Sequence, residues 1–205
     1  MIYMLLPLIW FAKLTLNILG CLLGLVIVPI ALLIPNDDSK YLTFKANEPH
    51  VYWLRRLPTW AKWWDNPIDG TLGDDDFRWA SRDIPFGLKN TSFLGQFWWM
   101  AVRNPFNYFK RFVLGCDVRK HPVKLLWGDV YVRDDYQSQG AQLLGCGHNW
   151  HFYMVRRWGN SKRAIVIELG NKFDLEDNKK TYSPNLEYKY FKGFTFEINP
   201  FKDIS

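Results

Sequence analysis

A chain of 205 residues is long enough for one domain of ordinary size and an appendage, and it leaves no room for a second large domain. Its three cysteines, an odd number, exclude a framework in which every cysteine pairs within the chain. A net charge of +6 and an aromatic content of 18% exclude neither lipid nor nucleic acid as a partner, because both present anionic groups and contacts for aromatic rings.

The first predicted element is a long apolar helix. Residues Leu14–Ile34 carry no charged side chain, and at ~1.5 Å per residue a helix of this run reaches ~32 Å, against a hydrocarbon core of ~30 Å. We therefore predict a transmembrane helix and assign residues 1–35 to a membrane anchor. A cleaved signal peptide is disfavoured, because no basic start or small-residue cleavage site flanks the run. A buried helix of a soluble protein stays open, as does an extension of the helix before Lys13.

Basic residues flank this anchor unequally. Lys13 stands almost alone before it, whereas four cations follow it: Lys40, Lys45, Arg55 and Arg56. Because the cytoplasmic flanks of membrane helices carry the excess of Lys and Arg, this bias predicts that the bulk of the chain is cytoplasmic.

The chain after the anchor is predicted to form one domain. Residues 36–50 are polar and have little periodicity, which predicts a linker. Residues 51–205 then form the domain, with aromatic and basic helices and loops in 51–120 and an antiparallel sheet in 121–205. The expected fold class is α+β, with an N-terminal transmembrane helix, amphipathic interfacial helices and a C-terminal antiparallel β-meander.

The domain begins with a segment that mixes tryptophan with cations. Between Val51 and Trp64, indole rings alternate with Arg and Lys side chains. Such rings settle at headgroup depth while the cations reach phosphate, so the segment is typical of a membrane interface. The same mixture stacks on single-stranded nucleic acid, but the anchor upstream favours lipid. Three rings are expected at the interface: Trp60, Trp63 and Trp64.

An acidic loop, "DNPIDGTLGDDDFRW", follows from Asp65 to Trp79. It matches part of a calcium-binding EF-hand, with Asp65, Asp69 and Asp76 as weak candidate ligands. Pro67 stands where a ligand is needed, however, and Asp76 is shorter than the usual Glu. Turn chemistry explains the loop better, because Asn and Asp bond to their own backbone and Gly accepts a positive φ. We predict no catalytic residue and structural turn or cap roles for Asn66, Pro67 and Gly70.

The next predicted element is an amphipathic helix over Phe93–Gly115. At about 100° per residue its polar side chains gather on one arc and its apolar side chains lie opposite. The polar arc holds Gln96, Arg103, Asn107, Lys110 and Arg111, and the apolar face holds Trp99, Val102, Phe106, Phe109 and Val113. A basic, aromatic helix beside an anchor predicts an element that lies on the membrane surface, and the alternative is packing on the protein's own sheet. The expected membrane contacts are Trp98, Trp99, Arg103, Lys110 and Arg111.

A proline interrupts this helix. Asn104-Pro105 marks either a kink or a fresh start, with Asn104 as the N-cap and Pro105 as the first helical residue. Both residues are therefore predicted to have structural roles.

The last third of the chain has short β-rich runs separated by Gly, Asn, Asp and Pro, such as "RAIVIEL" and "FTFEI". These runs predict the antiparallel meander. In "YFKGFTF", Lys192-Gly193 occupies the place of a two-residue hairpin turn. Phe194, Phe196 and Ile198 are then expected to line one face.

A second weak metal candidate is "CGHNWH", with Cys146, His148 and His151. Thiolate and imidazole groups bind zinc, but one strand would put Cys146 and His148 on one face and His151 on the other. A tetrahedral site would need a further ligand from elsewhere. We therefore expect no metal and no other cofactor.

Three segments together resemble a known family: "DNPIDGTLGDDDFRW", "WWMAVRNPFNYFKRFVLG" and "IELGNKF". They are similar to a family of short uncharacterised membrane proteins encoded by tailed bacteriophages. Its members have a hydrophobic amino terminus, a DNxxDGDxG loop, an RNPxxxF aromatic helix and a β-rich C-terminus. The sequence departs from this pattern at Thr71 and Leu72, which precede Gly73 and shift the acidic cluster. The resemblance implies a bacteriophage setting and assigns no activity.

Two classes of function remain. The first is a non-enzymatic phage protein anchored in the host bacterial inner membrane, with anionic lipid headgroups, and a host or phage membrane protein, as its partners. Its roles would be host takeover, superinfection exclusion or genome entry. The second is a membrane-bound hydrolase or transferase that uses Asp65, Asp69 and Asp74–Asp76 with a divalent cation. The first is preferred, because no nucleophile or oxyanion site accompanies the acids, and nucleic acid is not an expected partner.

Overall fold

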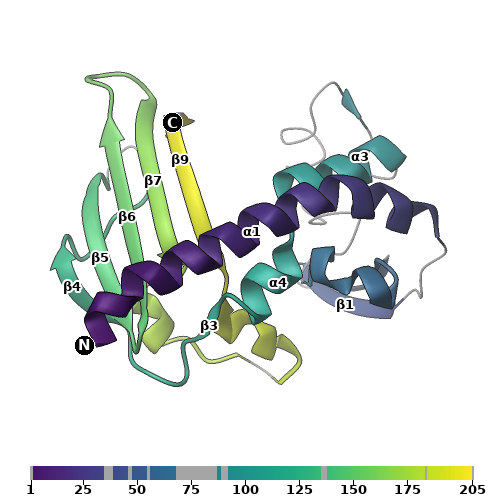
Figure 1. The fold of residues 1–205 in the computed structure, drawn as a ribbon, viewed down its shortest axis with the longest axis horizontal. Helices are drawn as coiled ribbons and strands as arrows, with labels where there is room; N and C mark the ends of the chain where they lie inside the picture. Colours follow the sequence, from purple (N-terminus) through teal and green to yellow (C-terminus); the bar gives the residue numbers. More distant parts are fainter. Residues whose placement is uncertain are drawn as a thin grey trace. The chain divides into compact units, whose positions relative to one another are not determined.

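The computed structural model describes residues 2–34, 39–45, 48–54, 56–67, 87–88, 92–134, 138–182 and 184–204. The predictions for Asp69, Gly70 and Asp74–Asp76 lie outside these ranges. The predicted α+β class is confirmed, with a long apolar helix at the amino terminus, short helices after it and antiparallel sheets towards the carboxyl terminus (Figure 1).

Helix α1 runs from Ile2 to Leu33. It therefore includes the apolar segment before Lys13 as part of one continuous helix. Within the described part of the chain, α1 is the one helix that is long and apolar enough to span a membrane, by length and composition, from Leu6 to Leu33.

The chain folds as two compact units, and α1 contributes to both. The sheet unit comprises Met1–Leu14 and Lys110–Ser205, and the helical unit comprises Thr15–Phe109. This division differs from the expected anchor, linker and single domain. The expected linker also contains strand β1 (Ser39–Lys45), which pairs with β2 (Glu48–Leu54).

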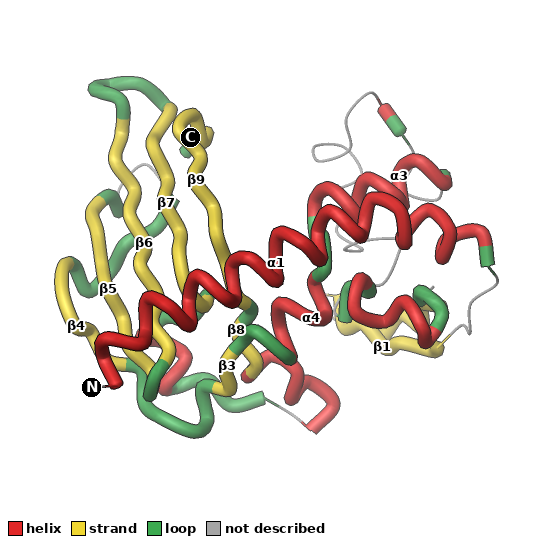
Figure 2. The backbone as a smooth tube through the Cα atoms, in the orientation of Figure 1, coloured by secondary structure: helices red, strands yellow, loops and turns green. Residues whose placement is uncertain are grey.

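Five antiparallel strands build the sheet unit, in the order β4-β5-β6-β7-β9 (Figure 2). They are β4 (Lys124–Gly128), β5 (Gly140–Cys146), β6 (Asn149–Arg157), β7 (Arg163–Asn171) and β9 (Phe194–Asp203). A second, small sheet pairs β3 (Cys116–Asp117) with β8 (Phe191–Lys192). The predicted hairpin turn at Lys192-Gly193 is therefore wrong, because β8 pairs with β3 whereas β9 pairs with β7.

Side chains of the main sheet alternate between two faces. The inner face contributes Leu144, Val155 and Val166 to buried hydrophobic clusters. The outer face carries two apolar rows that cross the strands. These rows are Leu143–Phe152–Leu169–Phe196 and Ala141–Met154–Ile167–Ile198. Phe194 and Phe196 share this face as predicted, since the Trp10 ring of α1 lies 6.3 Å from the first and 6.2 Å from the second.

Short helices follow the β1–β2 hairpin in the helical unit and continue to its boundary. They are η1 (Thr59–Trp64), α3 (Phe93–Phe97), the π-helical η3 (Trp98–Arg103) and α4 (Asn107–Phe112). The single helix predicted over Phe93–Gly115 is thus broken. Asn104 ends η3 as its C-cap, and α4 starts only at Asn107, so Asn104-Pro105 marks a fresh start that comes later than predicted.

The core of the helical unit forms where these short helices meet α1. Val28 and Ala31 of α1 are fully buried in one cluster with Trp64, Met100 and Phe106. Trp99, Phe106 and Phe109 of the apolar stripe therefore pack in the cluster that contains α1, whereas Val102 and Val113 are exposed.

Candidate functional site

Two glycines on α1 bring aromatic rings into contact with its backbone. Gly20 and Gly24 lie one helical turn apart on the same face. A Cβ atom at Gly20 would lie 2.1 Å from the Phe106 ring, and one at Gly24 would lie 2.8 Å from the Trp64 ring. Each ring therefore occupies the space that a side chain on α1 would take, as small residues allow in packed membrane helices.

The Trp64 ring also makes a polar contact with α1. Its Nε1–H donates a buried hydrogen bond of 2.7 Å to the carbonyl oxygen of Gly20. Trp64 was expected at a membrane interface, and the structure gives its ring a packing role with a satisfied N–H instead.

Phe106 has an unusual backbone conformation beside this contact. Its φ is 57°, a left-handed value that costs a non-glycine residue roughly 1–2 kcal/mol. Its ring stacks on Phe109 with centroids 4.4 Å apart and lies 5.3 Å from Trp64. These contacts hold the strained residue that follows Pro105.

The first residues of the acidic loop form a buried turn. The Asp65 carboxylate accepts a hydrogen bond from the Asn66 N–H at 2.8 Å. The backbone carbonyl of Asp65 accepts one from the Tyr108 N–H at 3.0 Å. Arg56 donates to the carbonyl of Asn66 at 2.8 Å and lies 3.5 Å from the Asp65 carboxylate. Burial raises the pKa of Asp65 to about 6, although Arg56 acts against this rise. Asp65 and Asn66 therefore have structural partners, and the other candidate ligands of the loop are outside the described residues.

The three residues of "CGHNWH" do not converge. Cys146 ends β5, His148 lies exposed in the following turn, and His151 is buried in β6, so the motif forms a hairpin and its three side chains come from different elements. The Cys146 thiol donates to the His121 carbonyl at 3.1 Å, and burial raises its pKa, which disfavours a reactive thiolate. No group of three potential metal ligands occurs among the described residues.

His151 belongs instead to a buried polar network that sequence reasoning missed. Its Nδ1 lies 2.8 Å from the Phe173 carbonyl and its Nε2 lies 3.2 Å from the Glu168 carboxylate. Burial favours a higher pKa for Glu168, but the hydrogen bond from His151 and the charge of Lys172 outweigh it and lower the pKa. Both partners are more than nine-tenths buried, so the pair ties β6 to β7 and has no access to a substrate. The sequence signal for this network was the presence of two polar residues, His151 and Glu168, within apolar strand runs.

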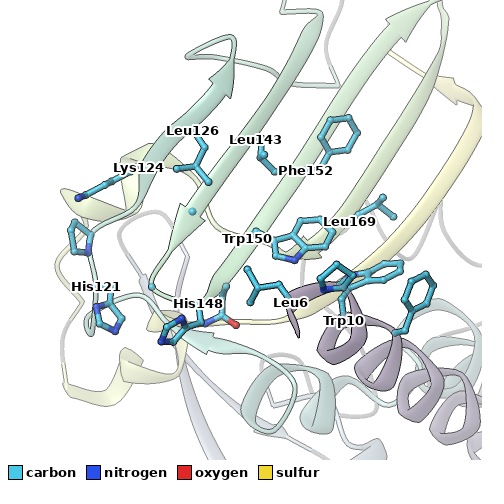
Figure 3. A pocket seen from close by; sticks show the side chains of 16 residues that line it. Leu6, Trp10, His121, Lys124, Leu126, Leu143, His148, Trp150, Phe152 and Leu169 are labelled. Atoms are coloured by element: carbon cyan, nitrogen blue, oxygen red, sulfur yellow. The ribbon is translucent and has the colours of Figure 1, made fainter. Parts of the chain in front are cut away.

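An apolar cavity of about 930 Å³ lies on the outer face of the sheet, within the sheet unit. Leu6 and Trp10 of α1 line it together with Leu143, Trp150, Phe152 and Leu169 of the strands (Figure 3). Its volume falls at the upper end of the ~300–1,000 Å³ of typical ligand sites. Sequence reasoning singled out His121 and His148 of the lining as possible metal ligands but not its apolar wall, because the cavity arises only when the first turns of α1 pack on the sheet.

Two side chains of α1 fix the helix beside this cavity. The Lys13 ammonium donates to the carbonyl of Leu114 at 3.0 Å and to the Asn149 side chain at 3.4 Å. The Trp10 ring lies 5.8 Å from the Trp150 ring. The Trp10 Nε1–H is buried and has no hydrogen-bond partner among the described residues. The first turns of α1 thus form a wall of the cavity that contacts with the sheet unit hold in place.

One polar end distinguishes the cavity from a simple apolar groove. His121, Lys124 and His148 line one side of it (Figure 3), and all three side chains are exposed. The His121 ring packs over Gly147, where an added Cβ would lie 2.5 Å from the ring and where φ is 60°. The turn therefore needs glycine at this position to hold His121 beside His148.

The residues expected at a membrane interface have different environments. Trp99, like Trp64, is buried, whereas Trp60 and Arg103 are exposed and Trp63, Trp98 and Lys110 are half-buried. Arg111 donates to the backbone carbonyls of Phe191 at 2.8 Å and Tyr188 at 3.4 Å. Packing and internal hydrogen bonds thus explain Trp64, Trp99 and Arg111, and contact of the other residues with lipid stays a prediction.

Comparison with known proteins gives one match. A family model described as "Family of unknown function (DUF7338)" matches residues 1–205. No curated protein and no solved structure matches the chain.

Proposed function

The chain belongs to the family of unknown function DUF7338, and from its own geometry we propose that it is a membrane-anchored, non-enzymatic protein that acts at a bilayer through lipid or protein contacts. The loop and RNP motifs further support a bacteriophage protein at the inner membrane of the host. Host takeover, superinfection exclusion and genome entry are the roles that such a location would serve.

The exposed surface of α1 carries this proposal. Only 28% of its most apolar stretch is buried in the protein, whereas the core helix of a soluble protein is mostly buried. The exposed apolar side chains include Leu8, Ile9, Phe11, Leu16, Leu19, Leu22, Leu23, Val26 and Ile30. A continuous apolar surface of this kind is typical of contact with lipid or with a partner protein.

The polar side chains near this surface support the same proposal. The Lys13 ammonium donates a hydrogen bond inside the sheet unit, and the Asn17 side chain accepts one from the Cys21 thiol at 3.7 Å. Both polar side chains therefore have hydrogen-bond partners within the protein. Each exposed Leu, Ile or Val contributes roughly −0.3 to −0.6 kcal/mol to insertion near the bilayer centre. Insertion of this face is therefore expected to be favourable.

Extraction of membranes with alkaline carbonate tests the attachment. The wild-type chain should stay in the membrane pellet. A variant with Leu19→Lys, Leu23→Lys and Val26→Lys should be released, because each lysine costs roughly 2.5–3.5 kcal/mol near the centre of a membrane helix. All three residues are exposed, so their replacement leaves the cores intact.

The matched control replaces the same three residues by isoleucine and should stay in the pellet. Release of the wild-type chain by carbonate would contradict the attachment.

A further inference from the structure

We propose that the cavity of the sheet unit holds one acyl chain of an anionic phospholipid, taken from the bilayer that α1 contacts. The inference rests on the proposed function, since it names the ligand that a membrane-attached chain of this structure would bind. Three features lead to it: the apolar wall of the cavity, its cationic end and its continuity with the exposed apolar face of α1.

The apolar wall matches a hydrocarbon chain. Leu143, Phe152 and Leu169 are neighbours in one row across β5, β6 and β7, and Leu6 and Trp10 face them from α1 (Figure 3). Contact with a methylene chain is favourable because it removes apolar surface from water. A polar metabolite would gain little from such a wall.

The cationic end matches an anionic headgroup. The Lys124 side chain is exposed at this end and has no ion pair among the described residues, and the imidazoles of His121 and His148 add further donors. A cation near an anionic membrane surface is attracted to the headgroups. A phosphate linked to the acyl chain would meet Lys124 while the chain lies against the sheet.

The bilayer is the source of the ligand because helix α1 both lines the cavity and presents the exposed apolar face that contacts lipid. Phe11 lines the cavity and is also 59% exposed on α1, next to the exposed Leu8 and Ile9. The apolar surface therefore continues from the cavity onto the helix face that contacts lipid. A chain of the neighbouring lipid reaches the cavity without crossing water.

Native mass spectrometry of the full-length protein in a mild neutral detergent tests the proposal. The protein is mixed in separate samples with dioleoyl phosphatidylglycerol, dioleoyl phosphatidylcholine and oleate. We expect one phosphatidylglycerol per chain to stay bound, with about tenfold less retention of phosphatidylcholine, as the loss of ~1.4 kcal/mol produces.

Two pairs of variants locate the site. Leu143→Trp fills the cavity and should lower retention about tenfold, the effect of ~1.4 kcal/mol, whereas Ile198→Trp, on the same face but outside the cavity, should not. Lys124→Glu should remove the preference for phosphatidylglycerol. Lys162→Glu makes the same charge change between β6 and β7, away from the cavity, and should keep the preference.

Three outcomes would overturn the lipid site: equal retention of the two phospholipids, retention of oleate alone, or an equal effect of Leu143→Trp and Ile198→Trp. Carbonate extraction of membranes that contain the same protein separates the two proposals. A wild-type chain that stays in the pellet but retains no phosphatidylglycerol overturns the lipid site alone, whereas its release overturns the attachment as well.

Discussion

Asp65 is the residue at which the acidic loop enters the helical unit. Asp65 is 6% exposed, and its carboxylate accepts the Asn66 N–H, while its backbone carbonyl oxygen accepts the N–H of Tyr108 in α4. Asp and Asn chemistry in the sequence predicted a structural turn at Asn66 and Pro67. The partner from α4 was not predictable, because Tyr108 is distant in the sequence and only the packing on α1 brings it near.

Asp65 is expected to give the stability a specific pH dependence. Its pKa is about 6 in the folded protein, above the usual 3.8, so the folded state binds more protons than the unfolded state between these values. The contribution to stability is therefore fully present below pH 3.8 and is lost as the pH rises through about 6. Its size is on the order of 2–3 kcal/mol.

Thermal unfolding of the full-length protein in detergent, followed by near-ultraviolet circular dichroism, checks this dependence. Asp65→Asn keeps an oxygen for the Asn66 N–H but does not titrate. The wild type should gain stability relative to this variant as the pH falls from 7 to about 4. Parallel curves for the two proteins would show that Asp65 does not control the pH response. Glu168, whose pKa shifts in the opposite direction, affects both proteins equally.

At the scale of elements, the contact between α1 and the aromatic segment decides how the second half of the helical unit folds. The sequence pattern over Phe93–Gly115 predicted one helix, because its polar and apolar residues follow a helical period. The structure breaks that helix at Asn104, Pro105 and Phe106, and the Phe106 ring enters the space above Gly20. Tertiary packing thus outweighs the local preference.

Two glycine variants test the closeness of this contact. In an exposed helix, Gly→Ala stabilises by about 0.8–1 kcal/mol through helix propensity, and this gain is the same at both positions. The added methyl meets the Phe106 ring at 2.1 Å from Gly20 but the Trp64 ring at 2.8 Å from Gly24. Gly20→Ala should therefore lower the melting temperature more than Gly24→Ala, with a destabilisation of roughly 1–3 kcal/mol.

Each glycine variant serves as the control for the other, since helix propensity cancels between them. A melting temperature for Gly20→Ala above that of the wild type would mean that the ring does not pack on the helix in solution.

The sheet was easier to predict than the helices. Alternating apolar residues and regular turn residues identify strands locally, and an antiparallel meander joins neighbours in the chain. The error at Lys192-Gly193 has a physical reason, because "YF" and "FTFEI" look like the two arms of one hairpin while the ladder of β8 is formed with β3. The cavity was not predictable, since Leu6 and Trp10 come from a segment that the sequence assigned to an independent anchor.

At the scale of the whole molecule, α1 is shared by two units. Trp10 and Lys13 contact the sheet unit, and Val28 and Ala31 lie in the core of the helical unit. Composition identified the helix, but it gave no sign that the same helix packs in both units. Removal of residues 1–35 would therefore damage both units, which is why the attachment has to be tested with exposed substitutions.

The sheet unit also predicts on which side of a membrane the two ends of the chain lie. Met1–Leu14 and Lys110–Ser205 form one compact unit, so both termini should face the same compartment. A single crossing by α1 would instead put Met1–Leu14 and Lys110–Ser205 on opposite sides of the membrane. This prediction therefore holds for a chain that inserts the exposed apolar face of α1 without crossing the bilayer once.

Labelling of cysteines added at each terminus, with a reagent that does not cross membranes, checks this prediction in intact cells and in opened cells. Both termini should react in the same preparation, and a variant without Cys21, Cys116 and Cys146 supplies the background. Opposite labelling of the two ends would show that the sheet unit does not form in the membrane.

The contact of Trp10 with Phe194 and Phe196 joins the first turns of the chain to its last strand. A ribosome that adds ~5–20 residues per second completes that strand, 170 residues after the end of α1, roughly 9–34 s after the end of the helix. During this time the helix has no partner in the sheet, and the lipid bilayer or a chaperone has to hold its apolar surface. The proposed attachment implies that the nascent chain reaches the membrane before the fold is complete, so the timing of synthesis would be part of how the protein assembles.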